Sequence, residues 1–326
     1  MPDRKNISDR PGTGHPVNLY AGRNLRRESP VAIAVNSPET LRDLNGVLIH
    51  RLVAVRDQAA LAARNPDADA IHDARVASRR AAAVLGILAT GGILQRSDAG
   101  AIKNMLRKMR CHGGVVRDLD VFLQGLSIAI RPGEERRLER WRLLIMQHRA
   151  MAVRLFIKSA VAVSADTRVA RCLTQLSRME EVVLQNALNT GIHWRLNAAC
   201  KKVRKALQQA LRERSVPAAH RARIAVKRLR YLYELCDEAN IIAVRIQLVR
   251  LRNFQTLAGD LNDCATAVRR LGKLHKSTIP PSELSDHAII KRLVKVHQSR
   301  IPRLTKRVLT AARFLLAAPD LCHNVD

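Results

Sequence analysis

The sequence predicts an all-α protein made of two antiparallel four-helix-bundle halves, related to each other by an internal pseudo-twofold repeat. From Leu41 onward, apolar residues recur every three or four positions, and no segment shows the two-residue alternation of a strand. Short segments rich in Gly, Pro and Asn cut this pattern into pieces of helix length, and short connections favour antiparallel packing. A basic motif also occurs twice, 148 residues apart, as expected if the chain contains two copies of one helical unit.

The first half, at about 41–163, is expected to hold four helices. Residues 1 to about 40 precede it as a disordered tail, because they are rich in Pro, Gly, Asn, Ser and Arg. The segments "ARNPDAD", "TGGILQRSDAG" and "RPGEE" separate the helices, and Gly91 fits the position at a helix C-terminus. The helices are expected at about 41–63 and 69–90, then from "RSDAG" to about 126 and from "RPGEE" to about 162.

The second half, at about 192–318, is expected to repeat this plan after a weaker connecting helix at about 166–188. The tripeptide "NTG" at 189–191 separates the two parts, because Asn and Gly favour turns. The expected helices span about 193–213, 217–238, 241–275 and 282–318, the last of them after "TIPPSE". Residues 319–326 remain as a short C-terminal tail.

The charge of the chain predicts a polyanionic partner. Its 326 residues contain 57 Lys and Arg against 28 Asp and Glu, a formal net charge of +29. The N-terminal tail holds few of these charges, so the excess lies in the helical part, where self-repulsion destabilises a compact fold unless an anion is bound. Aromatic residues make up only 3% of the chain, which disfavours a stacking site for single-stranded nucleic acid.

The repeated motif places cations on one face of each of two helices. Residues 72–82 read "HDARVASRRAA" and residues 220–230 read "HRARIAVKRLR". At about 100° per residue, the basic residues of each copy share one face and the apolar residues another. This face comprises His72, Arg75 and Arg79 in the first copy, and His220, Arg223, Lys227 and Arg230 in the second. A solvated helix face is the alternative, but the same order of His, Arg and a second cation in both copies favours a site for phosphate oxygens.

A second pair of similar segments supplies acidic residues. Residues 117–123 read "RDLDVFL" and residues 259–267 read "GDLNDCATA". Paired acids beside arginines can bind a metal, or they can orient and partly neutralise arginines on neighbouring helices. We favour the second interpretation, which assigns a structural role and no metal site to Asp118, Asp120, Asp260 and Asp263.

These segments together resemble the CHAD domain family, the conserved histidine α-helical domain. The resemblance rests on "IHDARVASRRAAAVL", "RDLDV", "AHRARIAVKRLRYLYEL" and "AGDLNDCA", and it covers about residues 41–318. It implies two helical-bundle halves around a basic cavity, binding of inorganic polyphosphate, and in some bacteria association with polyphosphate granules. The residues that it implies as polyphosphate-binding are His72, Arg75, Arg79, Arg80, Arg107, Arg110, Arg117, His220, Arg223, Lys227, Arg228, Arg230 and Arg252.

Three classes of function remain open at this point. Non-catalytic polyphosphate binding, without a cofactor, is the leading hypothesis. Nucleic-acid binding is the alternative, and weak non-specific binding is expected from the charge alone, although no helix-turn-helix, zinc or RNA-recognition motif is present. A metal-dependent phosphohydrolase is the least supported class, because the sequence lacks H-E-x-x-H, a Walker loop, a nucleophile elbow and the E-x-E-x-K strand motif of a triphosphatase module.

The remaining features predict a cytoplasmic protein, and the family resemblance adds association with polyphosphate granules. The six cysteines lie far apart without a C-x-x-C pair, which favours reduced thiols over disulfides. The segment "MPDRKNISDRPGTGHP" has no apolar region of the kind found in secretory signals. The longest apolar run, at 81–94, is too short to span a bilayer.

Overall fold

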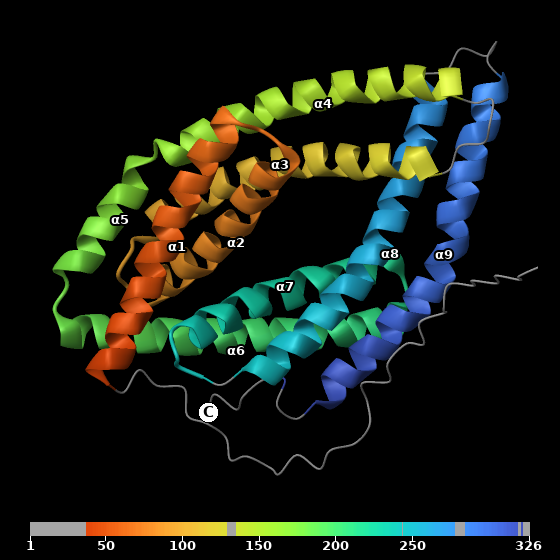
Figure 1. Cartoon of the computed structure of the whole chain (residues 1–326). Helices are drawn as coiled ribbons and strands as arrows, with labels where there is room; N and C mark the ends of the chain where they lie inside the picture. Colours follow the sequence, from red (N-terminus) through yellow and green to blue (C-terminus); the bar gives the residue numbers. More distant parts are fainter. Residues whose placement is uncertain (1–36, 129–134, 243, 278–283, 319–320, 322–326) are drawn as a thin grey trace, which may run out of the picture. The chain divides into compact units, whose positions relative to one another are not determined.

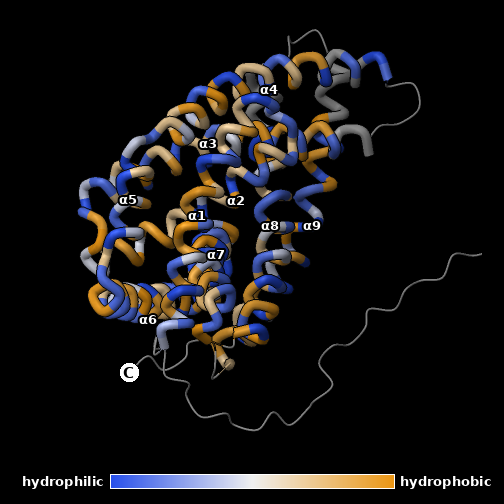
Figure 2. Tube along the Cα trace, turned by 60° about the vertical axis from the view of Figure 1, so that its left-hand side comes forward, coloured by the Kyte–Doolittle hydropathy of each residue, from blue (hydrophilic) through white to orange (hydrophobic). Residues whose placement is uncertain are grey.

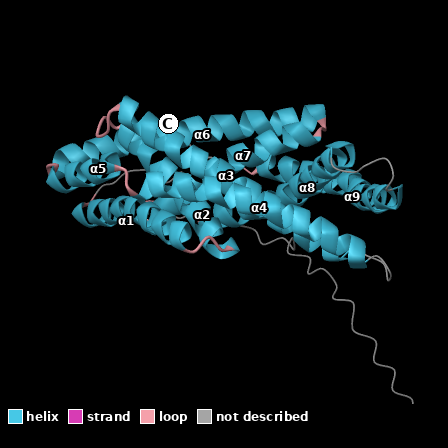
Figure 3. Cartoon of the chain, turned by 90° about the horizontal axis from the view of Figure 1, so that it is seen from above, coloured by secondary structure: helices cyan, strands magenta, loops and turns pink. Residues whose placement is uncertain are grey.

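All regular secondary structure in the described part of the chain is helical, which confirms the predicted all-α class (Figure 3). The computed structural model describes residues 37–128, 135–242, 244–277, 284–318 and 321. Its helices are α1 (Pro38–Arg64), α2 (Ala68–Thr90), α3 (Arg96–Ile128), α4 (Glu135–Ser164), α5 (Thr167–Arg178), α6 (Glu181–Glu213), α7 (Val216–Glu238), α8 (Arg245–Ser277) and α9 (Leu284–Ala317). The tails expected at 1–40 and 319–326 lie largely outside the described residues.

Short polar side chains set the beginnings of several helices. Ser37 Oγ accepts a hydrogen bond from the backbone N–H of Thr40 at 3.1 Å, and Asp67 Oδ1 accepts one from Ala70 at 2.7 Å. These caps satisfy N–H groups that have no partner inside the helix. Gly91 lies at the C-cap of α2, as the sequence predicts.

The helices pack as two sets of four. In the first set α1, α2, α3 and α4 each contact the next helix, and α4 returns to contact α1. In the second set α6, α7, α8 and α9 follow the same order, and α9 returns to contact α6. Figure 1 shows α2 beside α3 in one set and α7 beside α6 in the other. Helices α2 and α7 therefore occupy equivalent places in the order, whereas the twofold relation between the sets stays a prediction.

The connecting region differs from the sequence prediction. Helix α5 ends at Arg178 and α6 begins at Glu181, so the chain breaks near Met179 and continues as a helix through "NTG". Gly191 serves here as a point of close contact: a Cβ at this position would lie 2.5 Å from the carbonyl oxygen of Ile87 in α2. A glycine in a helix can mark either a break or a crossing, and in this helix it marks a crossing.

Two apolar clusters hold the arrangement together. The larger cluster runs through both sets of helices and includes Phe156, Phe254 and Tyr233, which are almost fully buried. Figure 2 shows hydrophobic and hydrophilic positions alternating along the helices, as amphipathic helices around a shared core require. The smaller cluster joins the C-terminal parts of α3 and α8 to the N-terminal parts of α4 and α9. Its buried residues are Phe122, Ile145, Leu271, Ile290 and Leu293. None of the described helices combines the length and apolar character needed to cross a membrane.

Candidate functional site

A cavity of about 610 Å³ lies where α2 and α3 of the first set face α7, α8 and α9 of the second. The smaller apolar cluster forms part of its wall, since Phe122, Leu271 and Leu293 belong to both. Both copies of the repeated motif contribute to the lining. The predicted binding residues that line it are His72, Arg75, Arg79, Arg117, Arg223 and Lys227.

Helical spacing explains why these side chains converge. His72, Arg75 and Arg79 follow one another at intervals of three and four residues, and so do Arg223 and Lys227, which places each group on one face of its helix. Behind Arg75, α3 carries a glycine that gives the side chain space. A Cβ at Gly113 would lie 2.9 Å from Arg75 Cδ and 3.0 Å from a ring carbon of Phe156. Gly113 therefore lets α3 approach both residues closely.

The cavity carries an excess of positive charge. The cations that line it are Arg75, Arg79, Arg117, Arg223, Lys227, Arg270 and Arg300, and the carboxylates are Asp118, Asp260 and Asp263. With histidines neutral and all lysines charged, seven positive groups thus face three negative groups. Crowding like charges into a partly desolvated space is unfavourable until an anion enters it.

Burial, and after it the crowding of charges, lowers the pKa values of three basic lining residues. Burial, followed by the charges of Arg79, Arg223 and other arginines, lowers the pKa of Lys227 to about 7. Burial and then Arg79 lower the pKa of Arg75 to about 10. The pKa of His72 is also lowered, first by burial and then by nearby arginines against the opposing effect of Asp73. A bound anion would relieve the repulsive contribution to each of these shifts.

The predicted structural acids separate into two groups. Asp118 accepts a hydrogen bond from Arg270 at 2.6 Å, which links α3 to α8 across the cavity. Asp260 and Asp263 also line the cavity. Asp120 instead accepts a hydrogen bond from Arg149 of α4 at 2.6 Å, outside the lining. No group of three or more His, Cys, Asp or Glu residues suited to a metal ion is found in the described part of the chain.

Three of the predicted binding residues converge on a buried carboxylate outside the cavity lining. Glu234 of α7 lies 2.9 Å from Arg230, 3.5 Å from Arg252 and 3.8 Å from Arg80. Its side chain is only 6% exposed, whereas those of Arg80 and Arg252 are 43% and 56% exposed. This acid therefore already neutralises part of the charge of its arginine neighbours.

The other predicted binding residues also lie outside the cavity lining. Arg110 donates a hydrogen bond to the backbone carbonyl of Ser78 at 3.1 Å. Arg107 and Arg228 are exposed. His220 is half-buried, and its Nδ1 is shielded from solvent and has no hydrogen-bond partner among the residues that the structure describes. The motif on α7 thus places Arg223 and Lys227 in the cavity, while His220 does not contribute to the lining.

The cavity also contains residues that sequence reasoning missed: Arg270, His297 and Arg300. A signal for Arg270 was present, because it lies ten and seven residues after Asp260 and Asp263 and so continues their helical face. His297 and Arg300 on α9 belong to no repeated motif, and only the packing of α9 against α8 brings them to the cavity.

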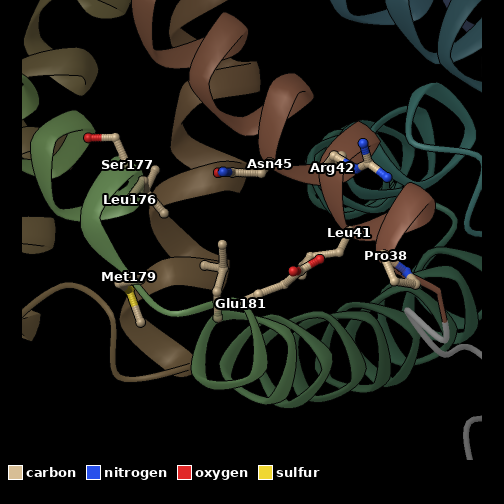
Figure 4. Close-up of a pocket in the computed structure, with 9 residues that line it drawn as sticks. Pro38, Leu41, Arg42, Asn45, Leu176, Ser177, Met179 and Glu181 are labelled. Atoms are coloured by element: carbon tan, nitrogen blue, oxygen red, sulfur yellow. The ribbon is translucent and has the colours of Figure 1, made fainter.

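A second pocket, of about 400 Å³, has a different character. It lies between the beginning of α1, the end of α5 and the beginning of α6 (Figure 4). Leu41, Leu176 and Leu184 give it an apolar wall, and its cation Arg42 is matched by the acid Glu181. The excess of positive charge thus distinguishes the larger cavity from this pocket.

Comparisons with known proteins agree with this architecture. The family model described as the CHAD domain matches residues 46–272. The crystal structure of the CHAD domain from the plant Ricinus communis is similar, with a TM-score of 0.58 and 16% identity over 90% of this chain and 97% of that one. PptA from Streptomyces chartreusis is similar with a TM-score of 0.50 and 15% identity over 85% of this chain and 97% of that one.

At these identities the structural likeness concerns the fold. No curated protein sequence matches the chain significantly. Because the family model covers well over half of the sequence, the chain belongs to the CHAD domain family.

Proposed function

We propose that this protein binds inorganic polyphosphate non-catalytically in the cavity between its two sets of helices. The observation that carries the proposal is the unbalanced charge of the lining, where seven Arg and Lys side chains face three carboxylates. Polyphosphate repeats one negative charge per phosphate along a flexible chain, so successive phosphates can meet cations on different helices. Membership of the CHAD family supports the same ligand, since the family resemblance implies polyphosphate binding.

The chemistry of the lining suits phosphate oxygens. Arginine offers a planar set of donors that matches two oxygens at once, and charge-assisted hydrogen bonds of this kind are stronger than neutral ones. Arg75, Arg79 and Arg223 can act in this way, while Lys227 provides a compact charge. Low exposure to water strengthens each interaction relative to the same pair at the protein surface.

The acids of the cavity fit a positioning role. Asp118 is held by Arg270 at 2.6 Å, so this carboxylate is engaged in holding α3 against α8. Phosphoanhydride hydrolysis needs an activated nucleophile or a metal–carboxylate site. We therefore include the absence of catalysis in the proposal, and release of phosphate from polyphosphate with added Mg²⁺ or Mn²⁺ would contradict that part.

The decisive experiment is a titration of the full chain with long-chain polyphosphate at near-physiological salt, with tRNA of matched total charge as the competitor. The test variant carries Arg75→Gln, Arg79→Gln, Arg223→Gln and Lys227→Gln, all in the cavity lining. The control variant removes the same number of charges from exposed positions outside the lining: Arg171→Gln, Lys201→Gln, Lys205→Gln and Arg303→Gln.

We expect tight binding that tRNA displaces poorly, a loss of at least a hundredfold in affinity for the cavity variant, and a small change for the control. Equal losses in both variants would mean that the net charge acts diffusely and that the cavity is not the site. Equally strong binding of tRNA would favour the nucleic-acid alternative.

A further inference from the structure

Four cations on the helices that contact α2 lie near enough to one another that, besides burial, the charge of another member lowers the pKa of three of them. Lys103 and Arg110 come from α3, Arg195 from α6 and Arg228 from α7, and none of them lines the cavity. We call these four residues the junction cluster. Helix α2 contacts α3, α6 and α7, the three helices that carry these residues.

The side chain of Arg195 lies against α2 at Gly86, where no Cβ occupies the space. A Cβ at Gly86 would lie 2.9 Å from Arg195 Nε and 3.0–3.1 Å from two further guanidinium atoms. The guanidinium therefore rests on the helix surface at a glycine. Its Nε is shielded from solvent and has no hydrogen-bond partner within the described residues. A shielded guanidinium donor without a partner is costly, and an anionic oxygen is the acceptor that best satisfies it.

Repulsion links the members of the junction cluster in three pairs. Burial is the main cause that lowers the pKa of Arg195, and the charge of Arg228 lowers it further. Burial likewise lowers the pKa of Lys103, and the charge of Arg195 adds to this effect. Burial and then Arg79 lower the pKa of Arg110 to about 10, with Arg228 contributing. Within the described part of the chain, no ion pair connects a carboxylate to any member of the junction cluster.

The repeated motif reveals what the junction cluster lacks. At the spacing of 148 residues, Arg80 corresponds to Arg228 and Gly86 corresponds to Glu234. Arg110 lies eight residues before Asp118, just as Arg252 lies eight residues before Asp260. The equivalent arginines thus lie beside the carboxylate of Glu234 in α7, at 3.8 Å for Arg80 and 3.5 Å for Arg252.

Near α2 a glycine stands where that carboxylate would be, and a further arginine fills the space. We propose that the junction cluster binds a phosphate group, which supplies from solution the negative charge that Glu234 supplies at the equivalent place. The ligand is an anion carrying two or more charges, either orthophosphate or the end of a phosphoanhydride chain. The proposal concerns a site separate from the cavity and does not depend on polyphosphate binding there.

The test is calorimetric titration of the full chain with tripolyphosphate and, in parallel, with orthophosphate. Gly86→Glu introduces the missing carboxylate without removing any cation, and the atoms nearest to its Cβ belong to the flexible end of Arg195. Arg228→Gln removes one exposed cation of the junction cluster. Lys205→Gln is the matched control, because Lys205 is an exposed cation of α6 outside the cluster. Arg75→Gln with Lys227→Gln weakens the cavity alone.

We expect Gly86→Glu and Arg228→Gln each to weaken one class of phosphate sites at least tenfold, while Lys205→Gln leaves it unchanged. The cavity variant should retain this class, which separates failure of this inference from failure of the proposed function. Saturation by orthophosphate alone would identify a single phosphate as the ligand, and saturation only by tripolyphosphate would identify a chain end. Unchanged titrations of Gly86→Glu and Arg228→Gln, with helicity and thermal unfolding preserved, would overturn the inference, and so would loss of all binding in the cavity variant.

Discussion

Lys227 should make polyphosphate binding depend on pH in a range that the cavity histidines His72 and His297 do not share. In the empty cavity its pKa is lowered to about 7, so at pH 9 only about one side chain in a hundred is charged. A bound phosphate chain favours the charged form and raises the pKa, so binding above pH 7 is accompanied by uptake of a proton. Between pH 9 and pH 6 the affinity should therefore rise by up to about a hundredfold, or about 2.7 kcal/mol.

His72 titrates in a different range. Its pKa is lowered from the usual value of about 6.5, so its contribution to binding increases only as the pH falls below that value. His297 also lines the cavity, and burial followed by the charge of Arg300 lowers its pKa. A rise in affinity that is already complete near pH 6.5 therefore reports on Lys227, and a further rise at lower pH reports on His72 and His297 together.

The assay is a titration with long-chain polyphosphate from about pH 6 to 9, where chain ends contribute little to the ligand charge. Lys227→Arg should flatten the profile above pH 7, because arginine stays charged throughout this range. His72→Gln should leave that part of the profile unchanged. A wild-type profile that is flat above pH 7, or a Lys227→Arg profile that stays as steep as the wild type, would refute the assignment.

Four further outcomes follow from the same structure. Lys227→Met should stabilise the empty protein more at pH 6 than at pH 9, because a lowered pKa in the folded state opposes folding increasingly as the pH falls; thermal unfolding at both pH values measures this. Asp118→Asn should raise affinity for tripolyphosphate several-fold by calorimetry, while the loss of its partly exposed ion pair changes the free energy of unfolding by less than about 1 kcal/mol. Gly191→Ala should destabilise the protein by about 1–3 kcal/mol in chemical denaturation, since its Cβ would meet the Ile87 carbonyl, whereas Gly272→Ala, with open space around it, should be neutral or stabilising. Raising salt should weaken polyphosphate binding, and the quadruple cavity variant should show a shallower salt dependence in the same titration.

The sequence was sufficient for the helices but less so for their assembly. Periodicity placed helix ends within a few residues because amphipathic spacing is a local property. It failed at "NTG", where Gly191 is part of a crossing between α6 and α2 that only the folded structure contains. A local signal cannot distinguish a glycine that ends a helix from one that admits a neighbouring backbone.

In the candidate site too, the sequence predicts what depends on a single helix and misses what depends on contacts between helices. Arg75, Arg79, Arg223 and Lys227 were identified because the face of one helix decides where they point. Asp118 and Asp120 are two residues apart and so lie on nearly opposite faces of α3, which explains why only Asp118 reaches the cavity. The outcome for other residues depended on partners from distant segments that no helical wheel contains.

Arg230 illustrates this dependence, and it connects the cavity to the junction cluster. It continues the face of Lys227, yet Glu234 one turn later holds it at 2.9 Å and takes it out of the lining. That carboxylate neutralises arginines on one side of the repeated helices. Because glycine stands at the equivalent position 86, the corresponding cations on the other side have no carboxylate partner among the described residues. At this position of the repeat one copy carries an acid, and the other carries a glycine beside cations whose charge a phosphate can neutralise. The positive charge of this chain is therefore organised by where acids are missing as much as by where arginines are present.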